Sequence, residues 1–219
     1  MLVLASASPR RRELLAQAGY EFVVRPAHVN EDVLPGEDPI AYVTRLARVK
    51  AMAAFAAGGG DQGSGIGNRT ELVVLGADTT VTVDGHILAK PEDAADAARM
   101  LRMLSGRTHR VMTGVAVVRG SSHVPKSEGH VASASMIVEV AAEVTAVTFL
   151  TLSDAEIDAY IATGEPMDKA GAYAIQGRAA KWIPRIEGCY FNVVGLPLAL
   201  VATMLESGKS REQATGRRE

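Results

Sequence analysis

Apolar and polar positions along the chain repeat with helical spacing in some segments and with strand spacing in others, which indicates an α/β fold. Residues 2–4 form a short apolar strand that runs into a helix start, where Ser8 suits the N-cap and Pro9 the first helical position. Residues 21–25 predict a second strand. The chain therefore opens with a strand that leads directly into a helix.

A second helix begins at Asp38-Pro39, with Asp38 as its cap. Its core-facing side is predicted by the helical spacing of Ile40, Val43, Leu46 and Ala47. Lys50 projects onto the same apolar side, and burying a lysine is costly unless its ammonium group meets an anion. Lys50 is therefore either a structural lysine whose charge reaches solvent or a residue that reaches into a site.

Residues 72–88 predict a buried strand, a break at Gly76-Ala77 and a hairpin that turns at Asp84-Gly85. Asp78 comes just after the apolar part of this strand. Ligands bind at the carboxyl ends of strands in α/β sheets, so Asp78 is a candidate metal ligand or general base. The alternative is a turn residue that holds the break in shape.

The rest of the chain continues the alternation. It predicts a helix from Lys90-Pro91 to Ser105-Gly106, long strands at 108–118 and 136–149, a helix capped by Ser153 and Glu156 that ends at Gly164, a strand-like segment at 183–194 and a helix at 196–205. The glycine-rich segment 58–67 lacks the P-loop lysine and predicts a surface loop. We expect one domain over residues 1–206, followed by a polar, frayed tail at 207–219.

Composition excludes several classes of protein. The net charge of −2, the pI near 6.2 and an aromatic content of 5% give no general attraction to nucleic acid or to an anionic membrane. Cys189 is the single cysteine, so no intramolecular disulfide can form. No apolar run is long enough to span a membrane, and the amino terminus lacks the order of a secretory signal, so we expect a cytoplasmic protein. The five histidines lack metal-ligand spacing and are expected at the surface.

Positive charge gathers at helix starts. Arg10, Arg11 and Arg12 follow Ser8, where backbone N–H groups and the helix dipole also attract anions. A phosphate site and a solvated basic turn or localisation signal both fit this cluster. Together with Lys90 and the carboxylate of Asp78, it suits a nucleoside triphosphate held with Mg²⁺ or Mn²⁺. Glu31 or Asp32 could share that metal.

The turn-rich run 164–177 is a further place for a site, because such loops often hold functional residues. Candidate ligand contacts in it are Asp168, Lys169, Tyr173 and Gln176. Asp168 and Lys169 could equally form a surface ion pair of little energetic value.

Five motifs resemble, in order, those of the Maf family of nucleoside triphosphate pyrophosphatases. They are Ala5-Ser-Ala-Ser-Pro-Arg-Arg11, Gly76-Ala-Asp-Thr79, Lys90-Pro91, Asp168-Lys-Ala-Gly-Ala-Tyr173 with Ile175-Gln-Gly177, and Val194-Gly-Leu-Pro-Leu198. The resemblance implies a two-lobed α/β fold, in which helices flank an elongated mixed sheet as in inosine triphosphate pyrophosphatases, with the active site in the central cleft. It also implies cleavage between the α and β phosphates, giving a nucleoside monophosphate and pyrophosphate.

The resemblance assigns roles to individual positions. Asp78 matches the catalytic proton acceptor, although a metal-ligand role for it stays open, and Glu31 matches an acidic position near the metal. The positions around the phosphates are matched by Ser8, Arg11, Lys50 and Lys90, and those of the branch that prefers dTTP and UTP by Arg10, Thr79 and Gln176. Ala174 departs from the glycine common in the family, which bears on specificity.

The partners that the resemblance implies are the nucleotide and a second copy of the chain in a homodimer. The alternative function is a nucleotide-binding regulator of cell division, because the family name comes from septum formation. Such a regulator would bind nucleotide without turnover.

Overall fold

The computed structural model describes residues 1–58, 71–121 and 136–215, so the surface loop expected at 58–67 lies almost entirely outside the described residues. In this part of the chain, strands form a mixed sheet in the order β2–β1–β3–β5–β6–β7, with β4 paired to β3. The strands are β1 (Leu2–Leu4), β2 (Val23–Val24), β3 (Glu71–Val83), β4 (His86–Leu88), β5 (Thr108–Ser121), β6 (Ile137–Thr148) and β7 (Arg185–Glu187).

The helices lie between and beside these strands. They are α1 (Pro9–Gln17), α2 (Pro39–Gly58), α3 (Ala94–Leu104), α4 (Asp154–Ile161), α5 (Tyr190–Val194) and α6 (Leu198–Thr215), together with the 3₁₀ turns η1 (Glu165–Asp168), η2 (Ala170–Ala172) and η3 (Arg178–Trp182). Several begin where the sequence predicts. Asp38 accepts hydrogen bonds from the backbone of Ile40 and Ala41, and Ser153 and Glu156 form the expected capping box.

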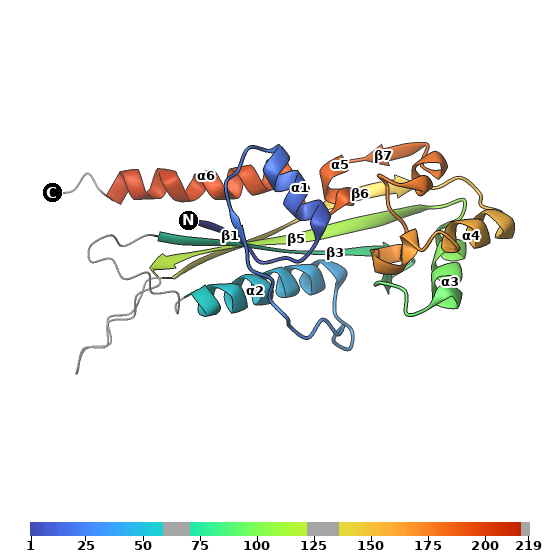
Figure 1. The fold of residues 1–219 in the computed structure, drawn as a ribbon, viewed down its shortest axis with the longest axis horizontal. Coiled ribbons are helices and arrows are strands. Elements are labelled where there is room, and N and C mark those ends of the chain that lie inside the picture. Colours follow the sequence, from blue (N-terminus) through green and yellow to red (C-terminus); the bar gives the residue numbers. More distant parts are fainter. Residues whose placement is uncertain (59–70, 122–135, 216–219) are drawn as a thin grey trace.

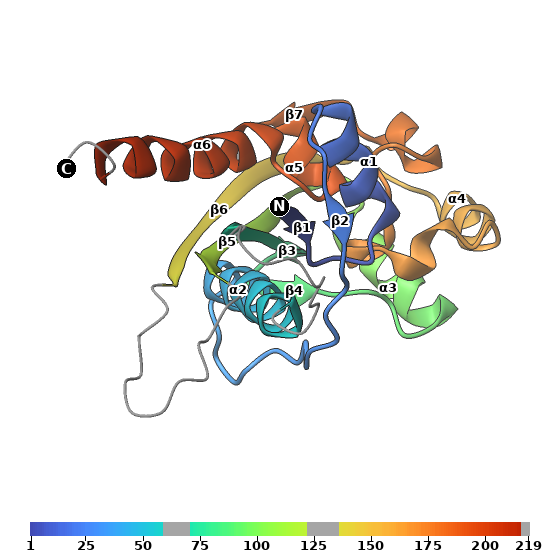
Figure 2. The ribbon, with the colours of Figure 1, turned by 60° about the vertical axis from the view of Figure 1, so that its left-hand side comes forward.

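Two lobes share the long strands β3, β5 and β6 (Figure 1). In one lobe, α2 covers one face of the sheet while α1 and α6 cover the other (Figures 1 and 2). The second lobe holds α3, α4 and the 3₁₀ turns, packed around the other end of the strands. The fold class predicted from the sequence, a two-lobed mixed sheet flanked by helices, is confirmed.

Helix α2 packs very closely on the sheet because two strand positions lack a side chain. A Cβ on Gly76 would lie 2.3 Å from the backbone oxygen of Ala47, and a Cβ on Gly114 would lie 2.3 Å from that of Val43. Gly114 is the cross-strand partner of Asp78, so both residues face the same side of the sheet. The close approach of α2 therefore occurs beside the carboxylate of Asp78.

The structure corrects several predictions at β3 and α2. No break occurs at Gly76-Ala77, because β3 is continuous through them, and Asp78 lies inside the strand rather than beyond its end. Gly76 leaves room for the close approach of α2 and does not end the strand. The hairpin at Asp84-Gly85 is confirmed by their positive φ angles and the pairing of β3 with β4. Ile40, expected in the core, is 43% exposed because it lies at the first turn of α2.

Later elements also differ from the predictions. The third helix begins after its cap Asp93 and not at Lys90, and the strand-like segment 183–194 divides into β7 and the short helix α5. Helix α6 continues through Thr215, so the residues after Ser207 begin as helix and not as a frayed tail. His109 is 2% exposed rather than at the surface, packed edge-on against Phe149.

Candidate active site

A cleft of about 560 Å³ lies where the two lobes meet. It is bordered by the start of α1, the loop before α2, strand β3 and the 3₁₀ turns. The site residues expected from the sequence that line it are Ser8, Arg10, Arg11, Glu31, Lys50, Asp78, Thr79, Lys90, Asp168, Lys169 and Gln176. Arg12, the third arginine of the basic cluster, is exposed and is not among the lining residues. The fold thus brings together residues from segments more than 150 positions apart.

Lys50 is the centre of the polar arrangement in this cleft. Its ammonium nitrogen lies 2.6 Å from Oδ1 of Asp78 and 2.6 Å from Oε1 of Glu31. Lys50 is 7% exposed, as is Asp78, and the two come from adjacent layers of the fold, helix α2 and strand β3. The burial of Lys50 on the apolar side of α2 is explained by these two carboxylates, which compensate its charge.

Glu31 is held as an anion by its surroundings. Partial burial acts to raise its pKa, but the hydrogen bond from Lys50 and the charges of Lys50, Lys90 and Arg11 outweigh it, so the pKa lies below its ordinary value. Glu31 and Asp78 each bond Lys50 through one oxygen. The second oxygen of each carboxylate has no hydrogen bond from the described residues and is available to another partner.

This donor set fits a divalent cation of the magnesium type, which prefers carboxylate oxygens and completes its shell with water and substrate phosphates. In the described residues, no group of three or more His, Cys, Asp or Glu side chains is arranged to hold a metal ion. A site built on Glu31 and Asp78 would therefore need oxygens from a bound ligand, as a nucleotide site does.

Arg11 ties three parts of the cleft together. Its guanidinium donates to the backbone oxygen of Gly195 at 2.8 Å, to Oγ of Ser6 at 3.1 Å and to Oγ1 of Thr79 at 3.0 Å. Burial lowers its pKa below the ordinary value, while Asp78 acts in the opposite direction. Arg11 thus supplies positive charge to the cleft and also fixes the start of α1 against β3 and the end of α5.

Ser8 occupies the N-cap position of α1, but its side chain makes no capping hydrogen bond. The backbone N–H of Ser8 instead donates to Oγ of Ser6, which sits two residues earlier. Within residues 1–58, 71–121 and 136–215, no group bonds the Ser8 hydroxyl, which lies at the positive end of the helix in a position suited to a phosphate oxygen.

The opposite wall of the cleft is formed by the turn-rich segment before η3. Asp168 is paired with Lys169 and lies 4.0 Å from Arg10, and these cations lower its pKa although burial acts to raise it. Gln176 is exposed and lines the same wall. Tyr173, a candidate contact in the sequence analysis, is only 5% exposed, and its hydroxyl lies 2.8 Å from Nε2 of His109.

Sequence reasoning missed several residues that line this cleft, among them Ser6, Tyr42 and Gly195. Ser6 and Gly195 belong to motifs quoted above, so their positions carried a signal. No sequence signal indicated Tyr42, because its hydroxyl donates a hydrogen bond to a backbone atom, the carbonyl oxygen of Glu31, at 2.9 Å.

The fold and the cleft define an α/β protein with a deep site rich in cations and built around a lysine that bridges two carboxylates. The chain belongs to the Maf family: the family model described as Maf-like protein matches residues 1–208. It is 52% identical over 204 residues to a dTTP/UTP pyrophosphatase of Koribacter versatilis, covering 93% of this chain and 92% of that protein. It is 51% identical over 204 residues to a dTTP/UTP pyrophosphatase of Moorella thermoacetica, covering 93% of each.

Among solved structures, a nucleoside-triphosphatase, or dITP/XTP pyrophosphatase, of Mycobacterium abscessus matches with a TM-score of 0.32 and 15% identity, over 67% of this chain and 72% of that one. In the part of the chain that the structure describes, no helix has the length and apolar character needed to cross a membrane.

Proposed function

We propose that this protein hydrolyses nucleoside triphosphates, with dTTP and UTP as its main substrates, to the nucleoside monophosphate and pyrophosphate. The main supporting observation is the Lys50 bridge between Asp78 and Glu31, at the centre of a cleft that Arg11 and Lys90 also line. Relatives about half identical over nearly the whole chain, both named dTTP/UTP pyrophosphatase, support the same substrates.

In the proposed reaction, Asp78 is the general base. Its Oδ1 is occupied by Lys50, so the free Oδ2 accepts the proton of a water molecule that attacks the α-phosphorus. The bond from the α-phosphorus to the bridging oxygen breaks, and pyrophosphate leaves. Lys50 keeps Asp78 oriented, since the two side chains are buried and only 2.6 Å apart.

The cations of the cleft bind the phosphates and offset the charge that develops as the bond breaks. This role falls to Arg11 and Lys90, together with the hydroxyl of Ser8 at the start of α1. A divalent cation, Mg²⁺ or Mn²⁺, would be held by Glu31 and by a free oxygen of Asp78 if that residue is not the base. When bound, it would neutralise phosphate charge and align the phosphates.

The base of the nucleotide would contact Gln176, with Arg10 and Thr79 nearby. An amide can donate and accept hydrogen bonds at once, which suits the mixed edge of uracil or thymine. Gln176 is exposed on the cleft wall, so its amide is accessible to a ligand. The segment that carries it is anchored by Tyr173 through the hydrogen bond to His109.

A panel of nucleoside triphosphates tests this proposal: dTTP, UTP, dCTP, dATP, GTP and 7-methyl-GTP, each with Mg²⁺ or Mn²⁺. Pyrophosphate and inorganic phosphate are measured separately. We expect pyrophosphate, with the highest kcat/KM for dTTP and UTP. Release of inorganic phosphate, or no release from any nucleotide, would contradict the proposal.

A nucleotide-binding regulator of cell division is not favoured, because the relatives are named for an enzymatic activity. A cytoplasmic location belongs to the proposal and is supported by the lone cysteine and the nucleotide substrate. Homodimer formation stays a proposal from the family resemblance.

A further inference from the structure

Glu31 is carried by a segment that has little structure of its own. Residues 25–38 contain neither helix nor strand, and the Glu31 side chain is 48% exposed. A carboxylate on such a loop would ordinarily sample many positions. Its 2.6 Å contact with Lys50 therefore requires the loop to be held from outside.

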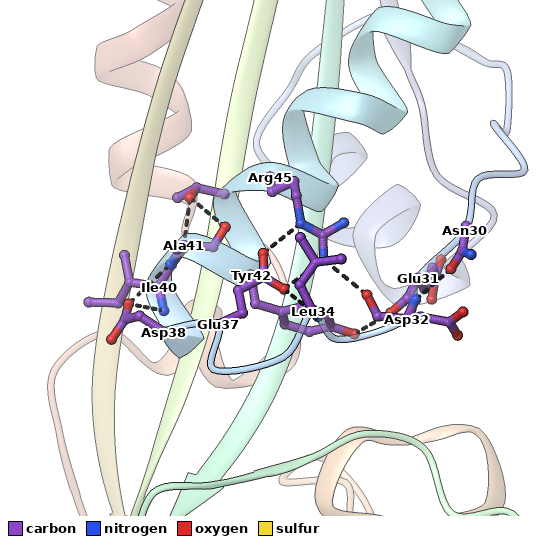
Figure 3. A network of polar contacts seen from close by, with 11 residues as sticks. Asn30, Glu31, Asp32, Leu34, Glu37, Asp38, Ile40, Ala41, Tyr42 and Arg45 are labelled. Carbon is purple, nitrogen blue, oxygen red and sulfur yellow. Dashed lines mark hydrogen bonds and ion pairs between the residues drawn. The ribbon is translucent and has the colours of Figure 1, made fainter.

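Two side chains of α2 hold this loop (Figure 3). The hydroxyl of Tyr42 donates to the backbone oxygen of Glu31 at 2.9 Å. Arg45 makes two parallel hydrogen bonds to Glu37, at 2.6 and 2.7 Å, and a third to the backbone oxygen of Asp32 at 3.0 Å. Glu31 itself and two residues that follow it, Asp32 and Glu37, are thus attached to the helix that also carries Lys50.

The attachment through Arg45 persists well below neutral pH. Arg45 holds the pKa of Glu37 at about 2, so this ion pair stays charged well below neutrality. The Arg45 guanidinium also lies over the Tyr42 ring, 5.6 Å from its centroid, which couples the two attachments.

We propose that Tyr42, supported by the Arg45–Glu37 pair, is a positioning residue that fixes Glu31 for the divalent cation. This inference rests on the proposed function, because it assigns the metal to Glu31. Tyr42 acts through the backbone of Glu31 and takes no part in bond breaking. Its loss therefore weakens the response to metal more than it lowers the rate at saturating metal.

The test substitutes Tyr42→Phe, which keeps the buried ring and removes the hydroxyl. Tyr190→Phe is the matched control, because Tyr190 is on α5 and is 39% exposed. Two quantities are measured. The first is the Mn²⁺ concentration for half-maximal pyrophosphate release from dTTP. The second is the Mn²⁺ dissociation constant, measured by electron paramagnetic resonance with an α,β-methylene analogue of dTTP. We expect Tyr42→Phe to raise the half-maximal Mn²⁺ concentration and the Mn²⁺ dissociation constant about fivefold each, equivalent to about 1 kcal/mol. The kcat at saturating Mn²⁺ should change less than about twofold.

A double variant separates positioning from general damage. In a Glu31→Gln background, Tyr42→Phe should add less than about a twofold change, because the carboxylate it positions is already gone. Arg45→Gln is the second probe if Tyr42→Phe does not fold. Arg45→Lys should weaken Mn²⁺ binding less than Arg45→Gln does. Metal binding unchanged from wild type, or an equal effect with and without Glu31, would overturn the inference.

The two proposals fail in different ways. If the wild-type protein releases no pyrophosphate, the proposed function is wrong, whereas Mn²⁺ binding still reports on Tyr42. If the wild type is active and Tyr42→Phe matches Tyr190→Phe in both assays, only the positioning role is wrong.

Discussion

Gly114→Ala should damage both stability and activity, because Gly114 lies under α2 and opposite Asp78. A Cβ there would lie 2.3 Å from the backbone oxygen of Val43 and 2.7 Å from the backbone nitrogen of Thr44, whereas real Cβ contacts essentially never fall below 3.0 Å. The difference between 2.3 and 3.0 Å requires α2 to retreat by about 0.7 Å, since backbone atoms cannot rotate away. Overpacking of this kind costs about 1 to 3 kcal/mol.

The same shift moves Lys50 away from Asp78, because Lys50 follows Val43 on α2 by about two helical turns. A displacement of about 1 Å in a catalytic group costs on the order of 100-fold in rate. Urea unfolding and the initial rate of pyrophosphate release from dTTP measure the two effects.

Gly120→Ala provides a control on the same strand. The Cβ at this position would meet the edge of the Phe55 ring at 2.9 Å, and that side chain can turn aside. We expect Gly120→Ala to cost less than about 1 kcal/mol and to retain activity. The reasoning is refuted if the free energies of unfolding of Gly114→Ala and Gly120→Ala differ by less than about 0.5 kcal/mol, or if Gly114→Ala keeps full activity.

Two further predictions concern the second lobe. Burial lowers the pKa of His109 to about 4. Between about pH 6.5 and 4, His109 is therefore protonated in the unfolded chain and neutral in the folded protein. The free energy of unfolding of the wild type should therefore fall by up to about 3 kcal/mol as pH drops through this window. His109→Gln should lack this pH-dependent loss. Equal pH dependence of urea unfolding in the two proteins would contradict the prediction. Ser153→Ala removes the hydroxyl of the α4 capping box and should lower the free energy of unfolding by about 1 kcal/mol, measured by urea unfolding, whereas no change would show that the cap is dispensable.

The elements that sequence reasoning predicted well are those determined by nearby residues. The Asp38 cap, the capping box at Ser153 and the hairpin at Asp84-Gly85 depend on contacts within a few positions. The placement of Lys50 on the buried side of α2 also follows from helical spacing alone.

The errors occur where distant residues decide the outcome. Gly76 weakens a strand locally, yet β3 runs through it because α2 needs the space. The apolar segment 183–194 has strand character, but the buried side chain of Asn192 donates to the backbone oxygen of Val111 and to Thr145, which fixes the short helix α5. His109 is buried because Phe149 and Tyr173, from other segments, enclose its ring.

Most residues of the candidate site were predictable because they lie in motifs, and Lys50 was predictable from helical spacing, although their contacts were not. Nothing in the sequence indicates that Arg11 bonds Gly195 or that Lys50 bridges two carboxylates at 2.6 Å each. The role of Tyr42 was hidden for another reason. Its partner is a backbone carbonyl, which every residue type provides.

The central claim is that Asp78 performs the chemistry in this cleft, and Asp78→Asn tests it most directly. The measurement combines single-turnover pyrophosphate release from dTTP with dTTP affinity on the same sample, and Asp158→Asn on the exposed surface of α4 is the control. The account predicts a loss of about 100- to 10,000-fold in release, with dTTP and Mn²⁺ binding retained. Pyrophosphate release at the wild-type rate would contradict it, and lost Mn²⁺ binding would make Asp78 a metal ligand instead.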